Sequence, residues 1–150
     1  MNVLRLAVLI ALLQVPPPKH LTIATAASTT SAAAGSQVSL FVDVTPNPGI
    51  HVYAPGTKDF LPIALKLDAM SGITIGELTY PKSQTLDFEG QKIPVYDKAF
   101  RLAQRVTLDR SLKKGDTVTL TGTVNYQACN DTVCFIPAKA TVRWTIGIRN

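Results

Sequence analysis

The chain has 150 residues, of which 46% are hydrophobic and 17% charged. This length and composition are typical of one globular domain with a single core, and they argue against a largely disordered chain. The formal net charge is +5 at pH 7, but the basic residues are scattered without interleaved aromatic residues, which argues against a nucleic-acid partner.

The first segment is apolar. A positive start at Arg5 precedes an apolar run from Leu6 to Val15, and Pro16-Pro17-Pro18 follows as a stiff spacer. The run is about half of the ~20 residues that span a bilayer, so it fits the apolar region of a signal peptide better than a transmembrane helix. We therefore expect residues 1–18 to be a leader and residues 19–150 to form the domain, with a buried strand as the alternative interpretation of the run.

Beyond the spacer, the sequence indicates short strands separated by turns. From Ser36 to Thr45, Val and Leu alternate with Ser, Phe and Asp, and this period of two predicts a half-buried strand. Pro46-Asn47-Pro48-Gly49 then breaks the strand. Further strands are expected at residues 50–53, 61–67, 73–80, 99–108, 117–126 and 138–148. Since no segment has a sustained helical period, we predict an all-β fold, an immunoglobulin-like antiparallel β-sandwich of seven to nine strands.

Both cysteines lie in the connection between the last two expected strands, in the segment NYQACNDTVCFIP. The spacing of Cys129 and Cys134 matches neither a C-x-x-C redox site nor a paired zinc knuckle. Across a hairpin the two residues could face each other and form a disulfide. Closing so short a loop would add only about 2 kcal/mol to the free energy of unfolding, so the bond would stabilise the fold weakly. A redox pair and a structural disulfide therefore both remain open.

The neighbours of the cysteines bear on their reactivity. Asp131 lies inside the loop without any Lys, Arg or His, so the local charge disfavours a thiolate. Such a pair would react only inside a complex, where a partner supplies the attacking thiolate or removes the proton. A metal-binding module is a third hypothesis, and it requires the two histidines, His20 and His51, to converge on the cysteines.

Three segments together resemble the family of the N-terminal domain of the thiol:disulfide interchange protein DsbD. Tyr126-Gln127-Ala128-Cys129 with Cys134-Phe135-Ile136-Pro137 is similar to the family signature Y-Q-x-C, short loop, C-x-x-P. Asp87-Phe88-Glu89-Gly90 resembles the family's cap loop, in which an aromatic ring lies over the cysteine pair, and Gly90 can supply a positive φ there. Gly49-Ile50-His51-Val52-Tyr53 resembles the strand whose aromatic residue flanks the pair.

The resemblance implies an exported, periplasmic bacterial domain that relays two electrons. A membrane electron donor of the DsbD type would reduce its disulfide, and the domain would then reduce periplasmic thioredoxin-like proteins. Cys134 resembles the cysteine that forms mixed disulfides, and Cys129 resembles the resolving one. The resemblance further implies a cap loop and site border made of Asp87, Phe88, Glu89, Gly90, Tyr53 and Tyr126.

This thiol:disulfide oxidoreductase would need no cofactor, because the sulfurs carry the electrons. It would contact a membrane only through an uncleaved leader. The alternative is a non-catalytic immunoglobulin-like binding or scaffolding module with a structural disulfide. Several features depart from the family, among them a shorter cysteine loop and a different arrangement of the acids around Phe88. His51 stands where an aromatic residue is common, and the chain lacks the membrane and thioredoxin-like domains of DsbD, so it would dock separate partners.

Overall fold

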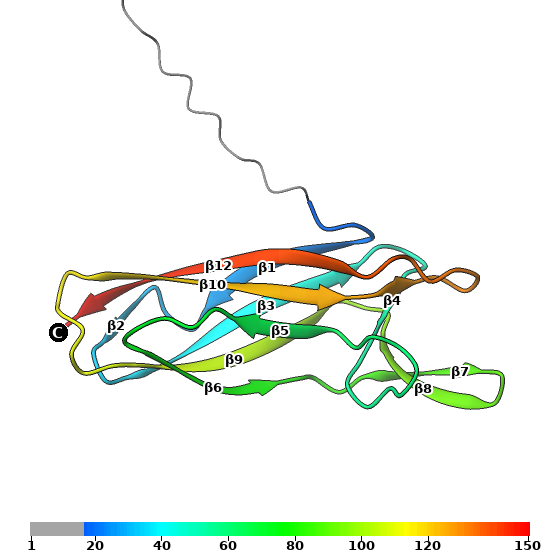
Figure 1. Cartoon of the computed structure of the whole chain (residues 1–150), viewed down its shortest axis with the longest axis horizontal. Helices are drawn as coiled ribbons and strands as arrows, with labels where there is room; N and C mark the ends of the chain where they lie inside the picture. The colour runs from blue at the N-terminus through cyan, green and yellow to red at the C-terminus, as the bar shows by residue number, and fades with distance from the viewer. Residues whose placement is uncertain (1–16) are drawn as a thin grey trace, which may run out of the picture.

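The computed structural model describes residues 17–150, and all regular structure in this range is β-strand. Figure 1 shows an elongated molecule whose strands run mostly along its length. The strands are β1 (Leu21–Ala27), β2 (Ser31–Ala33), β3 (Gln37–Pro46), β4 (His51–Tyr53), β5 (Ala64–Leu67), β6 (Ile73–Thr79), β7 (Gln84–Phe88), β8 (Gln91–Tyr96), β9 (Phe100–Leu108), β10 (Thr117–Tyr126), β11 (Ala128–Cys129) and β12 (Ala138–Arg149).

Nearly all of the expected leader, residues 1–16, lies outside the described residues. Its assignment stays a prediction. Between residues 17 and 150 there is no helix with the length and apolar character needed to cross a membrane.

The strands form three four-stranded sheets with the orders β1-β3-β9-β6, β2-β12-β10-β5 and β11-β4-β8-β7. The first two sheets make the two layers of the sandwich, and the third extends from one end of it, on the right in Figure 1. Every pairing between these strands is antiparallel except that of β2 with β12, which is parallel over three residues. The predicted all-β sandwich is confirmed.

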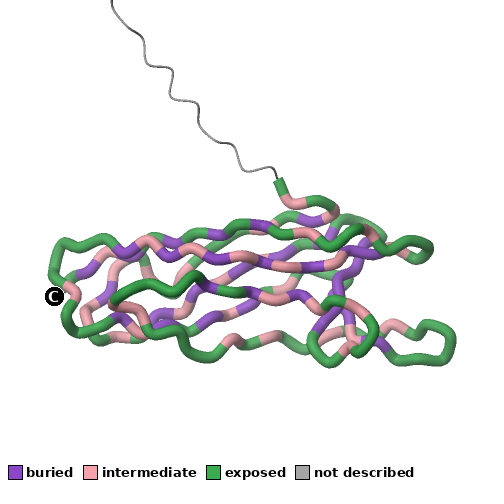
Figure 2. Tube along the Cα trace, viewed as in Figure 1, coloured by how far each residue is buried: buried purple, intermediate pink, exposed green. Residues whose placement is uncertain are grey.

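The alternation in the sequence makes the core. Every second residue of β3, β10 and β12 is buried, and Figure 2 shows this alternation along the strands. The inward residues of the two layers join in one apolar cluster that contains Val42 and Leu40 of β3, Leu120 and Val124 of β10, and Ile146 of β12. Burial of these side chains is the main favourable contribution to folding, at roughly 25 cal/mol per Å² of apolar surface removed from water.

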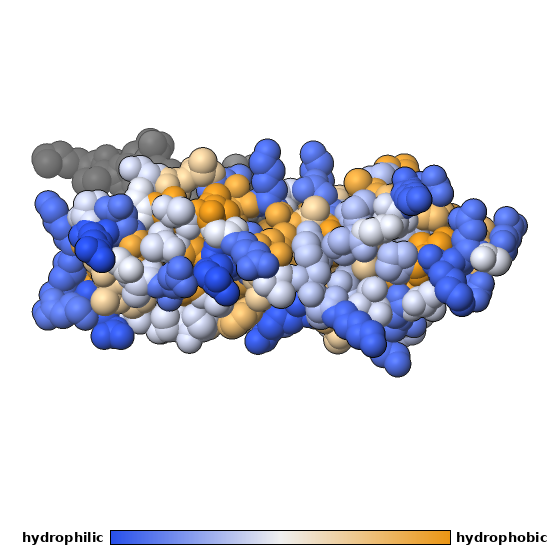
Figure 3. Space-filling model, turned by 90° about the horizontal axis from the view of Figure 1, so that it is seen from below, coloured by the Kyte–Doolittle hydropathy of each residue, from blue (hydrophilic) through white to orange (hydrophobic). Residues whose placement is uncertain are grey.

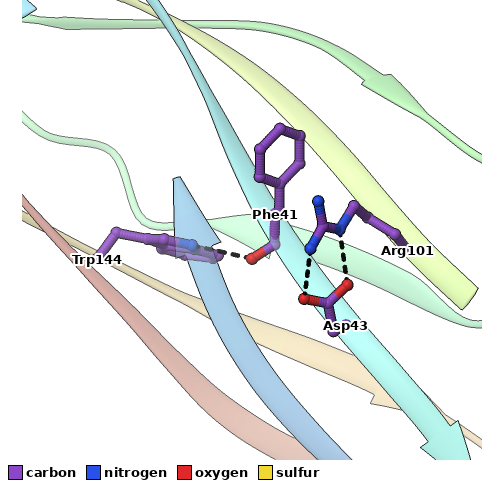
Figure 4. A network of polar contacts seen from close by, with 4 residues as sticks. All are labelled: Phe41, Asp43, Arg101 and Trp144. Carbon is purple, nitrogen blue, oxygen red and sulfur yellow. Dashed lines mark hydrogen bonds and ion pairs between the residues drawn. The ribbon is translucent and has the colours of Figure 1, made fainter. Parts of the chain in front are cut away.

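Polar contacts join β3 to β12 across the sandwich and to β9 within its own sheet (Figure 4). The indole Nε1 of Trp144 on β12 donates a hydrogen bond of 3.1 Å to the carbonyl of Phe41 on β3, and so joins the two sheets. On the outer face, the Arg101 guanidinium donates two hydrogen bonds, of 2.7 and 2.8 Å, to Asp43 and lies 4.5 Å from the centroid of the Phe41 ring. These bonds hold the pKa of Asp43 below its ordinary value.

The structure has more strands than the seven to nine expected. The sequence analysis missed β1, β2, β7, β8 and β11, and it began β5 too early, at residue 61. β1 is rich in Ala and Thr and buries only Leu21 fully, so it has no apolar alternation to detect. β7 is exposed or half-buried throughout because it is the edge of the third sheet. Such strands are held by backbone pairing with a neighbour, which a pattern of hydrophobicity does not reveal.

The surface of the sandwich matches the scattered charge of the sequence. Seen from below in Figure 3, hydrophilic side chains extend along the whole face with apolar patches between them. Large exposed apolar residues include Phe88 and Val133, which lie at the end of the molecule that carries the third sheet.

We predict that Gly122→Ala lowers the free energy of unfolding by about 1–3 kcal/mol, because overpacking at a close contact has that cost. Gly122 lies in β10 between β12 and β5, and an added Cβ would lie 2.9 Å from the carbonyl oxygen of Lys66 and 3.0 Å from a methyl of Leu67. The matched control is Gly147→Ala in β12, where the nearest atom would be 3.7 Å away. Urea unfolding of both variants tests this, and equal losses of stability would contradict it.

Candidate functional site

A short, tightly bonded loop positions the two cysteines. β11 leaves the end of β10 and pairs with β4, with Ala128 opposite Val52 and Cys129 opposite His51. The side-chain carbonyl of Asn130 then accepts hydrogen bonds from the backbone amides of Thr132, at 2.9 Å, and Val133, at 2.7 Å. These bonds turn the chain back. The backbone amide of Phe135 donates to the carbonyl of Ala128. The loop therefore holds Cys134 directly opposite Cys129.

Cys129 and Cys134 form a disulfide, and the two sulfurs lie in different surroundings. Cys129 is buried, with 1% of its surface exposed, whereas Cys134 is exposed. Thiol–disulfide exchange needs an in-line approach of a thiolate to one sulfur, so only Cys134 is open to attack. This asymmetry agrees with the roles that the sequence resemblance implies for the two residues.

Cys134 lies in an open groove of about 370 Å³ between the cysteine loop and the hairpin made by β7 and β8. Figure 1 shows these two segments projecting side by side from the same end of the sandwich, and Figure 2 shows that their tips are exposed. The groove is lined by His51, Tyr53, Phe60, Leu86, Asp87, Phe88, Ile93, Asn130, Asp131, Thr132, Val133 and Cys134. Its walls are largely apolar.

The segment expected to form a cap loop is the tip of a β-hairpin. Asp87 and Phe88 end β7, and Phe88 pairs with Gln91 of β8, which leaves Glu89 and Gly90 as a two-residue turn. Both turn residues have positive φ, 48° and 78°, the combination that two-residue hairpins favour. The positive φ expected of Gly90 is confirmed. The predicted loop is thus an ordered hairpin, and its Phe88 is 50% exposed.

Tyr53 contacts the exposed cysteine directly. Its hydroxyl lies 3.4 Å from the Sγ of Cys134, and because a disulfide sulfur has no proton, the hydroxyl is the donor. Burial raises the pKa of Tyr53 above its ordinary value, so the hydroxyl keeps its proton near neutral pH. Phe60 stacks on the Tyr53 ring at a centroid distance of 4.2 Å and holds it in place.

The structure brings together some of the predicted site residues and separates others. Asp87, Phe88 and Tyr53 line the groove with Cys134. Glu89 and Gly90 form the exposed hairpin turn and do not line it. Tyr126 is buried and also lies outside the groove lining, with its hydroxyl bonded to the backbone amide and carbonyl of Lys19 at 3.0 Å each.

Sequence analysis missed several residues of the groove, and His51 is the most important of them. The sequence analysis named His51 as a possible metal ligand and as a departure from the family within the flanking strand, but gave it no role at the cysteines. In the structure it is the cross-strand neighbour of Cys129. Within residues 17–150, no three His, Cys, Asp or Glu side chains are grouped so that they could hold a metal ion. The regular spacing of His51 and Tyr53 on one strand face was visible in the sequence, whereas the pairing of that strand with Cys129 was not.

Comparisons with known proteins identify a family whose model matches most of the chain. The family model described as "Thiol:disulfide interchange protein DsbD, N-terminal" matches residues 13–145. A sequence comparison with curated proteins gives no match. Among solved structures, the N-terminal periplasmic domain of ScsB from Proteus mirabilis aligns with a TM-score of 0.60 and 15% identity, over 88% of this chain and 49% of that one. The chain thus spans about half the length of that ScsB chain.

Two structures from Neisseria meningitidis are also similar. The reduced DsbD N-terminal domain aligns with a TM-score of 0.53 and 17% identity over 91% of each chain. The DsbD N-terminal domain in its complex with the PilB N-terminal domain aligns with a TM-score of 0.54 and 16% identity, over 91% of this chain and 94% of that one. At these identities the likeness shows the fold, and it confirms the predicted immunoglobulin-like architecture.

We predict that, in the reduced protein, iodoacetamide alkylates Cys134 at least about tenfold faster than Cys129, because exposure of the thiolate limits the reaction. Brief alkylation followed by peptide mass spectrometry measures both sites. Complete unfolding in guanidinium is the control, and it should make the two rates similar. Equal rates in the folded protein would show that the reduced pair does not keep the asymmetry of the disulfide.

Proposed function

Because the chain belongs to the family of the DsbD N-terminal domain, we propose that it relays two electrons between thioredoxin-like proteins through a reversible Cys129–Cys134 disulfide. This family relays electrons to thioredoxin-like partners. The observation that carries the proposal is the asymmetric disulfide, in which an exposed Cys134 lies in an open groove and a buried Cys129 lies behind it. A disulfide that only stapled the hairpin would not need one sulfur presented in a groove.

The exchange follows from this geometry. A thiolate of a reduced partner attacks the Sγ of Cys134, the bond from Cys134 to Cys129 breaks, and its electron pair stays on Cys129 as a thiolate. The partner's second thiolate then attacks the sulfur of the partner's first cysteine in the mixed disulfide. This step releases reduced Cys134 and leaves the partner oxidised. Electrons leave by the reverse steps, with Cys134 attacking the disulfide of the next partner and Cys129 displacing it. Two electrons and two protons balance in each cycle.

The groove suits a thioredoxin-like partner. Phe88 and Val133 expose apolar surface on its two sides, so a partner that reaches Cys134 would bury both. The solved complex of the Neisseria meningitidis DsbD N-terminal domain with the PilB N-terminal domain supports a partner that docks as a separate domain. For this chain we propose periplasmic thioredoxin-like proteins as targets and a membrane electron donor of the DsbD type as the source.

The remaining site residues have supporting roles in this proposal. Phe88 lies on the wall of the groove that holds Cys134 and narrows the approach to this sulfur until a partner displaces the β7–β8 hairpin, whose turn is Glu89-Gly90. Asp87 bonds Lys92 across that hairpin at 3.1 Å. Tyr53 orients the sulfur of Cys134, and Tyr126 anchors the end of β10 to Lys19 behind the cysteine loop. No cofactor takes part, because the sulfurs carry the electrons.

Export completes the proposal. The relatives in the family are periplasmic domains, and residues 1–18 have the pattern of a leader. We propose a periplasmic location, where thioredoxin-like donors and acceptors would keep the pair cycling. Any contact with a membrane would come through an uncleaved leader.

We predict that Cys129→Ala traps a mixed disulfide with an oxidised thioredoxin-like domain such as the PilB N-terminal domain. The remaining Cys134 attacks the partner's disulfide and forms the mixed disulfide. Because Cys129 is no longer there to release the partner in its reduced form, the adduct can only revert to the starting proteins through the partner's second thiolate. Non-reducing electrophoresis and mass spectrometry detect the adduct. Cys134→Ala is the matched control and should give little adduct, because Cys129 is buried. If both variants trapped the partner equally, or neither did, the relay would be rejected.

A second prediction concerns the shield. Phe88→Ala should let dithiothreitol reduce the disulfide severalfold faster, because loss of the ring widens the groove through which the small thiol approaches Cys134. The control is Ile136→Ala, which removes an apolar side chain that is 89% exposed and does not line the groove. The rate is followed by quenched alkylation. An unchanged rate in Phe88→Ala would remove the shielding role.

A further inference from the structure

His51 carries a polar atom that the oxidised structure leaves without a partner. Only 7% of its surface is exposed, and its Nε2 is buried without any hydrogen bond within the described residues. A buried polar group without a partner is costly, and native structures retain few of them. Each one therefore calls for an explanation, and neither packing nor the pairing of β4 gives one for an imidazole at this position.

The position of His51 relative to the cysteines suggests an explanation for its unpartnered Nε2. His51 is directly opposite Cys129 in the antiparallel pairing of β4 with β11. Side chains at such a position lie on the same side of the sheet, with Cβ atoms about 4.5–5.5 Å apart. Tyr53, two residues further along β4, lies on the same face, and its hydroxyl reaches Cys134. Strand β4 therefore contacts Cys134 through the hydroxyl of Tyr53 and places His51 on the same face as Cys129. The rings of His51 and Tyr53 lie edge to face at 5.5 Å.

The groups around His51 determine its charge. Burial lowers its pKa below the ordinary value, and the negative charges of Asp131 in the cysteine loop and Asp97 after β8 oppose this change. The net effect keeps the imidazole neutral near neutral pH, with one nitrogen free to accept a proton. Tyr53 is protonated and cannot serve as the base, and Asp87, the other carboxylate of the groove, bonds Lys92.

We propose that Nε2 of His51 is the proton acceptor for the thiol of Cys129 when the reduced domain transfers its electrons. This inference rests on the proposed relay and deepens it. In the dithiol, Cys129 regains a proton, and its S–H donates to the Nε2 that the disulfide leaves unpartnered. The imidazole needed for this is the neutral tautomer with hydrogen on Nδ1.

The chemical step balances within the site. In the mixed disulfide between Cys134 and a target, the Cys129 thiol passes its proton to Nε2 of His51. The sulfur electron pair then attacks the Sγ of Cys134, forming the Cys129–Cys134 bond and breaking the bond to the target. The target leaves as a thiolate, and the imidazolium loses its proton to water in the groove.

Such a base is needed because Cys129 is buried. Removal from water disfavours a thiolate and raises the pKa of a thiol, so few buried thiols are deprotonated near neutral pH. The sequence of the loop offers only Asp131, which opposes a thiolate further. A neutral imidazole next to the sulfur removes the proton as the bond forms and avoids an isolated buried charge.

A two-phase reaction with dithiobis(nitrobenzoate) isolates this step. Cys134 of the reduced protein attacks the reagent and releases a first equivalent of thionitrobenzoate at a rate that depends on reagent concentration. Cys129 then attacks Cys134 and releases a second equivalent at a rate that does not. Stopped-flow absorbance over a range of pH measures both phases in wild type, His51→Gln and His51→Phe. Gln keeps a polar side chain without a titrating base, and Phe keeps a ring.

We expect both variants to slow the second phase about tenfold or more near neutral pH while the first phase keeps its rate, as for loss of a general base. The wild-type second phase should be flat between the pKa of His51 and that of the Cys129 thiol. In the variants it should rise steadily with pH across the same range, since only pre-formed thiolate reacts. His20→Asn, which removes the other imidazole of the chain, should keep the wild-type profile.

A second phase in folded His51→Gln with the wild-type rate and pH profile would overturn the inference and leave the relay standing. Release of only one equivalent by the wild-type protein would mean that Cys129 does not close on Cys134, and the relay itself would then be rejected together with the role of His51. Circular dichroism confirms the fold of each variant, and His51→Gln decides the outcome if His51→Phe does not fold.

Discussion

The site depends on the pairing of β4 with β11. This two-residue ladder holds Cys129 against the body of the third sheet, opposite His51, and the loop that follows can return only to the outer side. One sulfur is thus buried and the other presented, although the two residues are five positions apart. A disulfide in a free hairpin would expose both sulfurs to any thiol. The ladder therefore leaves the sulfur of Cys134 as the one that an incoming thiolate can reach.

The sandwich supplies the rigidity that this arrangement needs. β10 and β12 are long strands paired along ten residues, and the cysteine loop is the connection between them. The β7–β8 hairpin belongs to the third sheet and projects past the same end, so the groove forms between an anchored loop and an edge hairpin. β7, the edge strand of this hairpin, has no buried residue, and such a segment has low local stability, which suits a segment that a partner displaces. Binding specificity and access to Cys134 would then be controlled by the same contact.

Much of the fold could be predicted from the sequence. Strong alternation identified β3, β10 and β12 and placed Cys129 and Cys134 in one connection, because a period of two is a local signal. The edge strands β1 and β7 lack that signal. Backbone hydrogen bonds to a neighbouring strand hold them, and such bonds leave no pattern in the side chains. The resemblance identified Phe88 and Tyr53 as neighbours of the cysteines. It gave no role to His51, because a side chain opposite Cys129 becomes visible only when the register of two separate strands is known.

The redox equilibrium of the Cys129–Cys134 pair in the folded protein tests the relay most directly. The fraction oxidised is measured by thiol alkylation across a glutathione or dithiothreitol series. We predict a reduction potential in the range of thioredoxin-family carriers, about −180 to −270 mV, at which electrons pass in either direction with a small change in free energy. A potential below about −300 mV is typical of structural disulfides. It would contradict the relay and show that the bond is structural, as in a non-catalytic binding module.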